Sequence, residues 1–124
     1  MKIVQTEKAP AAVGPYSQAI IANGMIYCSG QIAIDPSVGK IVAEDIEGQA
    51  DQCCKNIEAV LDAAGVDLCN AVKTTCFLAE IADFAKFNSV YEKYFVSKPA
   101  RSCVAVKDLP KNALCEIEVI AVES

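Results

Sequence analysis

Hydrophobic and polar positions alternate along the C-terminal part of the chain with the period of a pleated strand. The alternation predicts one strand over Ser102–Val106 and a second over Leu114–Val122, joined by a short connection rich in turn-forming residues. The second strand is apolar except for Glu116 and Glu118, which its parity places on one face. Charged side chains on an apolar sheet are costly unless they are paired or solvated, so we select Arg101 and the two glutamates as candidate functional residues.

Short strands are also predicted in the N-terminal part. Lys2–Gln5 is typical of an edge strand. Gln18–Ala22 and Met25–Ser29 flank the dipeptide Asn23-Gly24, which is the strongest short-range signal for a β-hairpin because both residues accept positive φ. Residues 32–44 contain a proline and a glycine, and they predict a connecting hairpin or loop.

The pattern then changes to the period of an amphipathic helix. Apolar side chains recur at intervals of three and four from Ile46 to Ala64, with Asp45 as the expected N-cap and Gly65 as the expected stop. Lys73–Leu78 predicts a strand, and Asp83 is expected to cap a second helix. We assign the aromatic stripe of this second helix to the core; it consists of Phe84, Phe87, Tyr91 and Tyr94.

This order of elements predicts a single α+β domain over residues 1–124, with one mixed sheet and two helices. Both helices should lie on the same face, because each returns the chain to a neighbouring strand by a right-handed crossover. However, Ala19–Ala22, Met25–Cys28 and Val119–Val122 are apolar at successive positions, which implies burial on both faces of the sheet. Since two helices cannot cover both faces, we expect the uncovered face to pack against other copies of the chain.

Composition and charge argue against a nucleic-acid-binding protein and against a membrane protein. The formal net charge is −5 and no run of lysine and arginine stands out, which argues against a nucleic-acid partner. No stretch approaches the roughly 20 apolar residues that span a bilayer. The first residues lack the apolar centre of a signal peptide. We therefore expect a soluble, cytoplasmic protein with no membrane partner.

The seven cysteines, at positions 28, 53, 54, 69, 76, 103 and 115, invite a disulfide or metal interpretation. Their number is odd, there is no CxxC motif, and the chain has no histidine, so we expect neither a mixed zinc site nor a disulfide framework. Most lie within apolar runs, where cysteine behaves as a small hydrophobe, and a reducing compartment fits them best.

The chemistry left to the chain is limited. Without histidine there is no Ser-His or Cys-His nucleophile system, and no phosphate-binding glycine loop is present. Arg101 can clamp a small carboxylate through its planar fork of donors, and Glu116 can orient and deprotonate a water molecule. Such groups suffice only for an already reactive bond, for example an imine.

Long motifs in the chain resemble the RidA family, also called YjgF/YER057c/UK114. They are Pro99-Ala100-Arg101-Ser102-Cys103-Val104, Leu109-Pro110 and Glu116-Ile117-Glu118, preceded by Gly14-Pro15-Tyr16 and Ser29-Gly30-Gln31. The resemblance covers essentially the whole chain, in order. It implies a chorismate-mutase-like α+β subunit with a six-stranded mixed sheet and two helices on one face. It also implies a homotrimer whose ligand clefts lie between subunits.

The resemblance implies an enzyme of metabolite repair that needs no cofactor, and the sequence itself offers no cluster of metal ligands. Such proteins hydrolyse reactive 2-imino acids, 2-iminopropanoate and 2-iminobutanoate, to 2-keto acids and ammonia; these imines escape from pyridoxal-phosphate enzymes that act on serine or threonine. Carried over to this chain, Arg101 binds the substrate carboxylate and Glu116 positions the attacking water. We expect the two groups, on neighbouring strands, to meet at a seam between identical chains. The resemblance places further residues around the ligand, some from the adjacent subunit: Tyr16, Ser29, Gly30, Asn88 and the backbone of Cys103.

Alternative functions stay open at this point. Arg101 and a glutamate across a sheet edge also fit a structural ion pair, and Glu118 shares the parity of Glu116 and could be the acid/base instead. The chain could be a non-catalytic trimer that binds a small carboxylate or a partner and regulates. An older description of the family, endoribonuclease or translation inhibitor, is disfavoured by the acidic charge and the missing histidine.

Individual site residues also have a plain structural interpretation. Tyr16 could anchor its loop, Asn88 could face solvent, and the Cys103 thiol could simply pack. The loop of Val96–Lys98 is shorter than in many family members, and Lys98 stands where many have an aromatic or apolar residue. The side chain of the preferred substrate is therefore not determined by the sequence.

Overall fold

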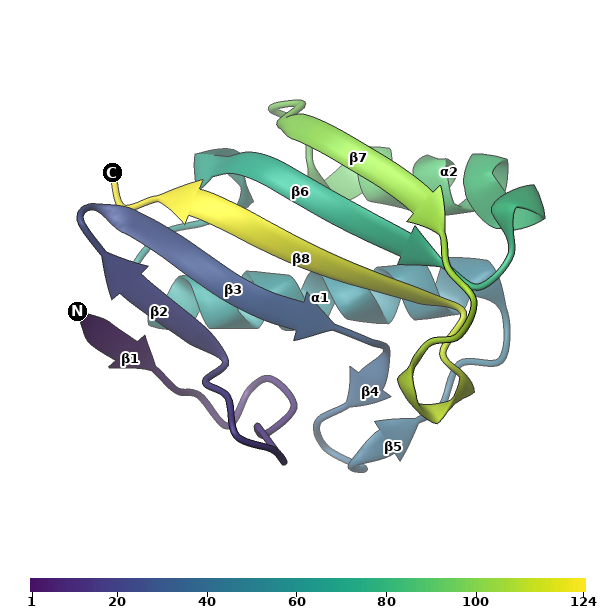
Figure 1. Cartoon of the computed structure of the whole chain (residues 1–124), viewed down its shortest axis with the longest axis horizontal. Coiled ribbons are helices and arrows are strands. Elements are labelled where there is room, and N and C mark those ends of the chain that lie inside the picture. The colour runs from purple at the N-terminus through teal and green to yellow at the C-terminus, as the bar shows by residue number, and fades with distance from the viewer.

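A six-stranded mixed sheet carries two helices on one of its faces, which confirms the predicted architecture (Figure 1). The computed structural model describes residues 1–124. The strands lie in the order β1-β2-β3-β8-β6-β7; only β6 and β7 run parallel, and the other neighbours are antiparallel. Their bounds are β1 Lys2–Val4, β2 Ala19–Ala22, β3 Met25–Gln31, β6 Ala71–Leu78, β7 Ala100–Ala105 and β8 Cys115–Val122.

Both helices, α1 (Ile46–Ala63) and α2 (Phe84–Tyr94), lie behind the sheet in Figure 1. Neither is long and apolar enough to cross a membrane. The segment expected to be a hairpin or loop forms a separate two-stranded hairpin, β4 (Ile34–Asp35) with β5 (Lys40–Ile41). Three short 3-10 helices complete the chain; they span Leu68–Asn70, Ile81–Asp83 and Pro110–Asn112.

The two C-terminal strands are not neighbours, contrary to our expectation. They follow one another along the chain, but β6 lies between them and pairs with both. The physical reason is the character of the two sequences. The apolar β8 takes a central position between β3 and β6, where both of its edges are paired and its inner face packs against α1. The more polar β7 occupies the edge.

The N-terminal hairpin forms where it was predicted. Asn23 and Gly24 connect β2 to β3 with φ values of 51° and 77°, so both adopt the left-handed conformation that the turn requires. The pairing of β3 with β8 then shifts register between Cys28 and Gln31. This irregularity is a β-bulge, and bulges commonly redirect side chains near functional sites. It contains Gly30.

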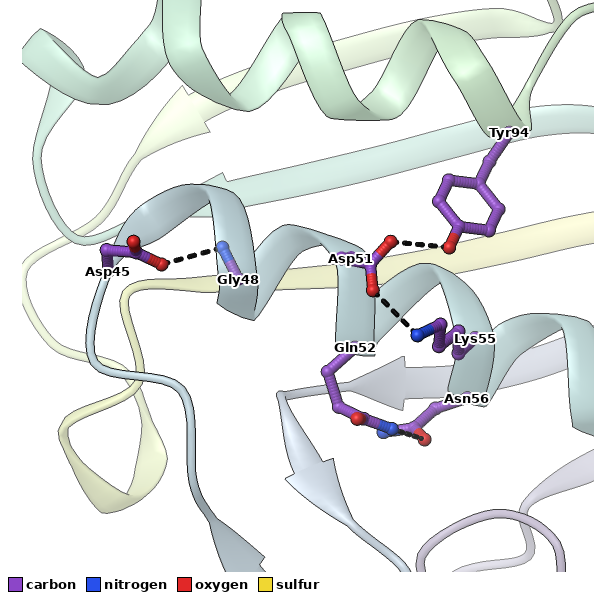
Figure 2. Close-up of polar contacts among 7 residues, drawn as sticks. All are labelled: Asp45, Gly48, Asp51, Gln52, Lys55, Asn56 and Tyr94. Atoms are coloured by element: carbon purple, nitrogen blue, oxygen red, sulfur yellow. Dashed lines mark hydrogen bonds and ion pairs between the residues drawn. The ribbon is translucent and has the colours of Figure 1, made fainter.

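Capping interactions fix α1 as predicted. The Asp45 carboxylate accepts a hydrogen bond from the Gly48 backbone N–H at 2.8 Å (Figure 2). Gly65 follows the helix end with a φ of 87°. The helix also contacts α2 through a polar link, in which the Tyr94 hydroxyl donates to Asp51. Asp51 in turn forms an ion pair with Lys55 at 2.9 Å.

Two details of the α2 prediction were wrong. Asp83 precedes the helix, but its side chain caps nothing, because Ile81–Asp83 already forms a 3-10 turn and leaves Asp83 at φ −84° and ψ 1° instead of in the extended conformation of an N-cap. The aromatic stripe is only partly in the core. Phe87 and Tyr91 are buried, whereas Phe84 is exposed and Tyr94 is half-buried.

The core lies between the sheet and the helices. It includes five of the seven cysteines, none of which forms a disulfide; the buried ones are Cys28, Cys53, Cys54, Cys76 and Cys115. Burial raises the pKa of Cys28 and Cys76 to about 12, so these thiols stay protonated at neutral pH. The prediction that most cysteines act as small hydrophobes is thereby confirmed.

The opposite face of the sheet, which we call the outer face, is not covered by any element of the chain (Figure 1). Alternation of burial along the strands assigns its side chains, which are mostly apolar. Tyr27 is 47% exposed and Val104 46% exposed. The apolar members are Ile20, Ala22, Met25, Tyr27, Phe77, Val104, Ile120 and Val122.

Candidate functional site

Arg101 and Glu116 lie on opposite faces of the sheet within one chain. In the strand register Arg101 is opposite Thr74, a fully buried residue of the helix-facing side, whereas Glu116 is opposite Phe77 of the outer face. The single ion pair of the chain joins Lys55 to Asp51. The interpretation of Arg101 and a glutamate as a structural ion pair is therefore wrong.

The Arg101 side chain rests on α2. Its guanidinium donates from Nη1 to the side-chain carbonyl of Asn88 at 2.7 Å. Its Cζ lies 4.7 Å from the ring centre of Tyr91 and 5.5 Å from that of Phe84. Asn88 is half-buried and bound to the arginine, so it does not simply face solvent. The aromatic stripe, which we assigned to the core alone, also stacks against a cation.

A depression of about 340 Å³ opens beside this arginine. No carboxylate forms an ion pair with the guanidinium, and only one of its N–H groups donates to a protein side chain. The remaining donors are available to a planar, negatively charged ligand. Arg101 is also the only arginine in the chain, so no second bidentate clamp exists. The depression is lined by Asn88, Tyr91, Glu92, Phe95, Lys98, Pro99 and Arg101.

Glu116 lies over the bulge of β3. A Cβ atom added to Gly30 would fall 2.0 Å from Glu116 Oε2, so the carboxylate occupies the space that glycine leaves open. The residue is half-buried. Burial, and to a lesser extent the nearby carboxylate of Glu118, raise the pKa of Glu116 above its ordinary value. A raised pKa brings a carboxylate closer to the range of a general base at neutral pH.

We expect the substitution Gly30→Ala to displace the Glu116 carboxylate and to lower kcat/KM of a reaction in which this carboxylate is the base by about 10²-fold, because a shift of about 1 Å in such a group has that effect. The φ of Gly30 is not in the left-handed region, so alanine should fit the backbone and leave Tm nearly unchanged. The matched control is the same change in a Glu116→Ala background, where no further loss should occur. An equal loss in both backgrounds would show that Gly30 acts without Glu116.

Ser29 of β3 tethers the loop that carries Tyr16. The Ser29 hydroxyl donates to the Ser17 carbonyl at 2.6 Å, and the Ser29 N–H donates to the Gln18 carbonyl at 2.9 Å. Gln18 is buried, and its side chain bridges the backbone of Thr6 and Pro10. The Tyr16 side chain is half-exposed at the wall of a second cavity of about 440 Å³, and its hydroxyl has no hydrogen-bond partner in the chain. Anchoring of the loop therefore comes from Gln18 and Ser29 rather than from Tyr16.

Cys103 follows Arg101 on the same side of β7 and is half-buried. Burial raises the pKa of its thiol, and the lowering effect of Arg101 does not compensate. The side chain is therefore not an activated nucleophile. Because β7 is an edge strand, part of its backbone N–H and C=O groups stay available to a ligand, which fits the expected role of the Cys103 backbone.

The predicted site residues thus form two groups. The arginine group comprises Arg101, Asn88 and Cys103 at the β7 edge; the glutamate group comprises Glu116, Gly30 and Ser29 around the β3 bulge. Tyr16 joins the second group through its tethered loop. No cluster of His, Cys, Asp or Glu is suited to hold a metal ion.

Sequence reasoning missed Phe84 and Tyr91 as contacts of Arg101. A signal exists, because Phe84, Phe87 and Tyr91 recur at intervals of three and four residues and therefore share one face of the helix. The strand that would present a cation to that surface is known only once α2 is packed against the sheet.

Comparison with known proteins identifies the family of the chain. The profile of the family described as Endoribonuclease L-PSP matches residues 6–123. A human protein named 2-iminobutanoate/2-iminopropanoate deaminase is 46% identical over 98% of this chain and 90% of its own length. AldR of Lactococcus lactis, named as a candidate regulator, is 54% identical over 98% of this chain and 97% of its own.

Solved structures agree as well. The structure of E. coli TdcF with bound serine superposes with a TM-score of 0.95 at 41% identity and covers 100% of both chains. The chain therefore belongs to the Endoribonuclease L-PSP family, which is the RidA/YjgF family.

Proposed function

We propose that this protein hydrolyses 2-iminopropanoate and 2-iminobutanoate to the corresponding 2-keto acids and ammonia. The observation that carries the proposal is that the chain presents two charged groups without an ion-pair partner. One is the Arg101 guanidinium beside a depression, and the other is the half-buried Glu116 carboxylate with a raised pKa. Support comes from the relatives named as deaminases of these imines, and from the serine, a small amino acid with a carboxylate, bound to TdcF.

The arginine and glutamate groups lie on opposite faces of one sheet, so a complete site needs two copies of the chain. We assign Arg101 of one copy and Glu116 of its neighbour to the same cleft. The apolar outer face supports this assembly, since an open face of this kind is typically covered in an oligomer. In line with the family resemblance, the assembly is a homotrimer with three clefts.

The proposed reaction uses only these side chains, the backbone and water. Arg101 holds the substrate carboxylate through two parallel N–H···O bonds and so fixes the adjacent C=N carbon. Glu116 accepts a proton from a water molecule while the water oxygen bonds to that carbon. The proton passes to the nitrogen and leaves a tetrahedral amino alcohol. Glu116 then takes the hydroxyl proton and returns it to the nitrogen, the C–N bond breaks, and ammonia leaves as the keto group forms. No cofactor is required, because the imine carbon is already electrophilic.

Disruption of the outer face tests the assembly. We expect Ile120→Asp to convert the trimer into monomers of 13.2 kDa, because it places a charge at the centre of an apolar interface. The monomer should also lose imine hydrolysis, since each cleft needs two copies. Light scattering with size exclusion measures the mass. Val42→Asp, at a 56% exposed valine outside the main sheet, serves as the control and should leave the trimer intact. A wild-type monomer, or a fully active Ile120→Asp monomer, contradicts the shared cleft.

A coupled assay tests the activity itself. A pyridoxal-phosphate serine/threonine dehydratase generates the imine in place, and the keto acid is timed by its reduction with NADH and a dehydrogenase. We expect the wild-type protein to shorten the lifetime of both the three- and the four-carbon imine. Keto acid release at the spontaneous rate with both imines would overturn the proposal.

A second candidate function is favoured by one relative. The similarity to AldR, named as a candidate regulator, favours a regulatory role. The protein would then be a non-catalytic trimer that binds a small carboxylate. In that case 2-oxobutanoate raises the Tm of the protein, and imine hydrolysis stays at the spontaneous rate. We expect no nucleic-acid partner in either case, since the net charge is −5.

A further inference from the structure

A buried hydrogen bond joins β6 to α2 directly beneath Arg101. Thr74 Oγ1 and the Tyr91 hydroxyl lie 2.7 Å apart. Thr74 is fully buried and Tyr91 is 8% exposed, so this bond is shielded from water. Thr74 is also the residue of β6 that stands opposite Arg101 in the parallel register. The bond therefore fixes the Tyr91 ring relative to the strand from which Arg101 extends.

The hydrogen bond of the guanidinium and both of its cation–π contacts come from α2. Tyr91 lies under it at 4.7 Å, Phe84 contacts it at 5.5 Å, and Asn88 accepts one of its N–H groups at 2.7 Å. None of these contacts neutralises the positive charge of the guanidinium, because two come from aromatic rings and one from an uncharged amide. An ion pair with a carboxylate would instead consume the fork of donors that a ligand needs.

We propose that Thr74 and Tyr91 are positioning residues that hold the Arg101 guanidinium facing the depression before any ligand binds. The proposal deepens the proposed function, because it gives the carboxylate clamp a supporting structure. An arginine side chain in solution samples many rotamers, and fixing it on binding costs free energy. A guanidinium already held flat on an aromatic ring loses less freedom when a carboxylate arrives.

Matched variants on α2 separate positioning from general stability. Tyr91→Leu removes the ring under Arg101, and Tyr94→Leu removes a tyrosine of the same helix whose hydroxyl donates to Asp51 instead. We expect Tyr91→Leu to raise the KM for the imine by about 3- to 30-fold, which corresponds to one cation–π contact. Tyr94→Leu should leave KM unchanged, whatever it does to Tm. Tyr91→Phe and Thr74→Val remove only the buried hydrogen bond and should raise KM less.

Two further readouts respond to positioning alone. Binding of 2-oxobutanoate, measured by calorimetry, should weaken in Tyr91→Leu, whereas binding of its uncharged amide should not. Because Arg101 is the only arginine, its Nε–H gives a single resolved signal in a ¹⁵N spectrum. Ring currents should shift that signal in the wild type, and Tyr91→Leu should return it towards the position of a free arginine.

The outcomes distinguish this proposal from the proposed function. If the wild type hydrolyses no imine but its Arg101 signal is shifted and moves only in the Tyr91 and Thr74 variants, the deaminase function fails and the positioning role stands. An Arg101 signal that is the same in the wild type, Tyr91→Phe and Thr74→Val overturns the positioning role. An equal rise of KM in Tyr91→Leu and Tyr94→Leu overturns it as well. Should Tyr91→Leu not fold, the comparison of Tyr91→Phe with Tyr94→Phe decides in the same way.

Discussion

Replacement of Glu116 by glutamine is expected to slow imine hydrolysis by about 10²- to 10⁴-fold, the usual contribution of a positioned acid/base. Glutamine keeps the shape that fits against Gly30 but cannot accept a proton from water. The loss should therefore appear in kcat, with a small change in KM. The coupled keto-acid assay under saturating imine measures it.

The pH dependence gives an independent check on the same residue. Burial and Glu118 raise the pKa of Glu116, so its ionised form disappears at a higher pH than that of an ordinary glutamate, whose pKa is about 4.3. As the pH falls, we expect kcat to drop along an acid limb centred above that value. The limb should be absent from the residual activity of Glu116→Gln.

Glu118→Gln is the matched control, because Glu118 lies on the same face one pleat away. It should keep most of the activity and move the acid limb of the wild type to lower pH, since it removes a like charge beside Glu116. If Glu118→Gln loses more activity than Glu116→Gln, the two glutamates exchange roles, and the assignment that rests on the family resemblance is wrong.

Replacement of Arg101 by alanine should lower the kcat/KM of imine hydrolysis steeply. It removes two charged hydrogen bonds to the substrate carboxylate, each worth about 1.5–3 kcal/mol, and the combined loss corresponds to about 10²- to 10⁴-fold in kcat/KM. Arg101 is the only arginine in the chain, so no other side chain can form the same bidentate contact. Arg101→Lys keeps the charge but lacks the planar fork, so its kcat/KM should lie between those of the wild type and Arg101→Ala.

Lys73→Ala provides the control for loss of a nearby cation, since Lys73 lies on β6 and contacts Ser102 of β7 at 3.4 Å. It should leave kcat/KM within about twofold.

Tm should change little in Arg101→Ala, because the side chain is only half-buried and has no ion-pair partner to leave uncompensated. Retention of wild-type kcat/KM in Arg101→Ala would remove the carboxylate clamp from the proposed function.

Much of the architecture could be predicted because its signals are local. The hairpin at Asn23-Gly24 depends on two residues that accept positive φ, and α1 on its apolar period and on Asp45. The placement of both helices on one face follows from the handedness of crossovers. Asp83 shows the limit of such signals, because its side chain does not cap α2. The preceding 3-10 turn changes the backbone conformation of Asp83, and the residue type alone does not predict that turn.

The sequence by itself determined which side chains can do chemistry here. A chain with one arginine, no histidine and two glutamates on an apolar strand offers a carboxylate clamp and an acid/base, and little else. Only the tertiary structure decided where they lie. Insertion of β6 between β7 and β8 fixes the register, and the register puts Arg101 on the helix-facing side and Glu116 on the outer face. Strand order depends on contacts between segments far apart in sequence, which no local pattern encodes, and the same contacts bring Tyr91 and Asn88 beneath the arginine.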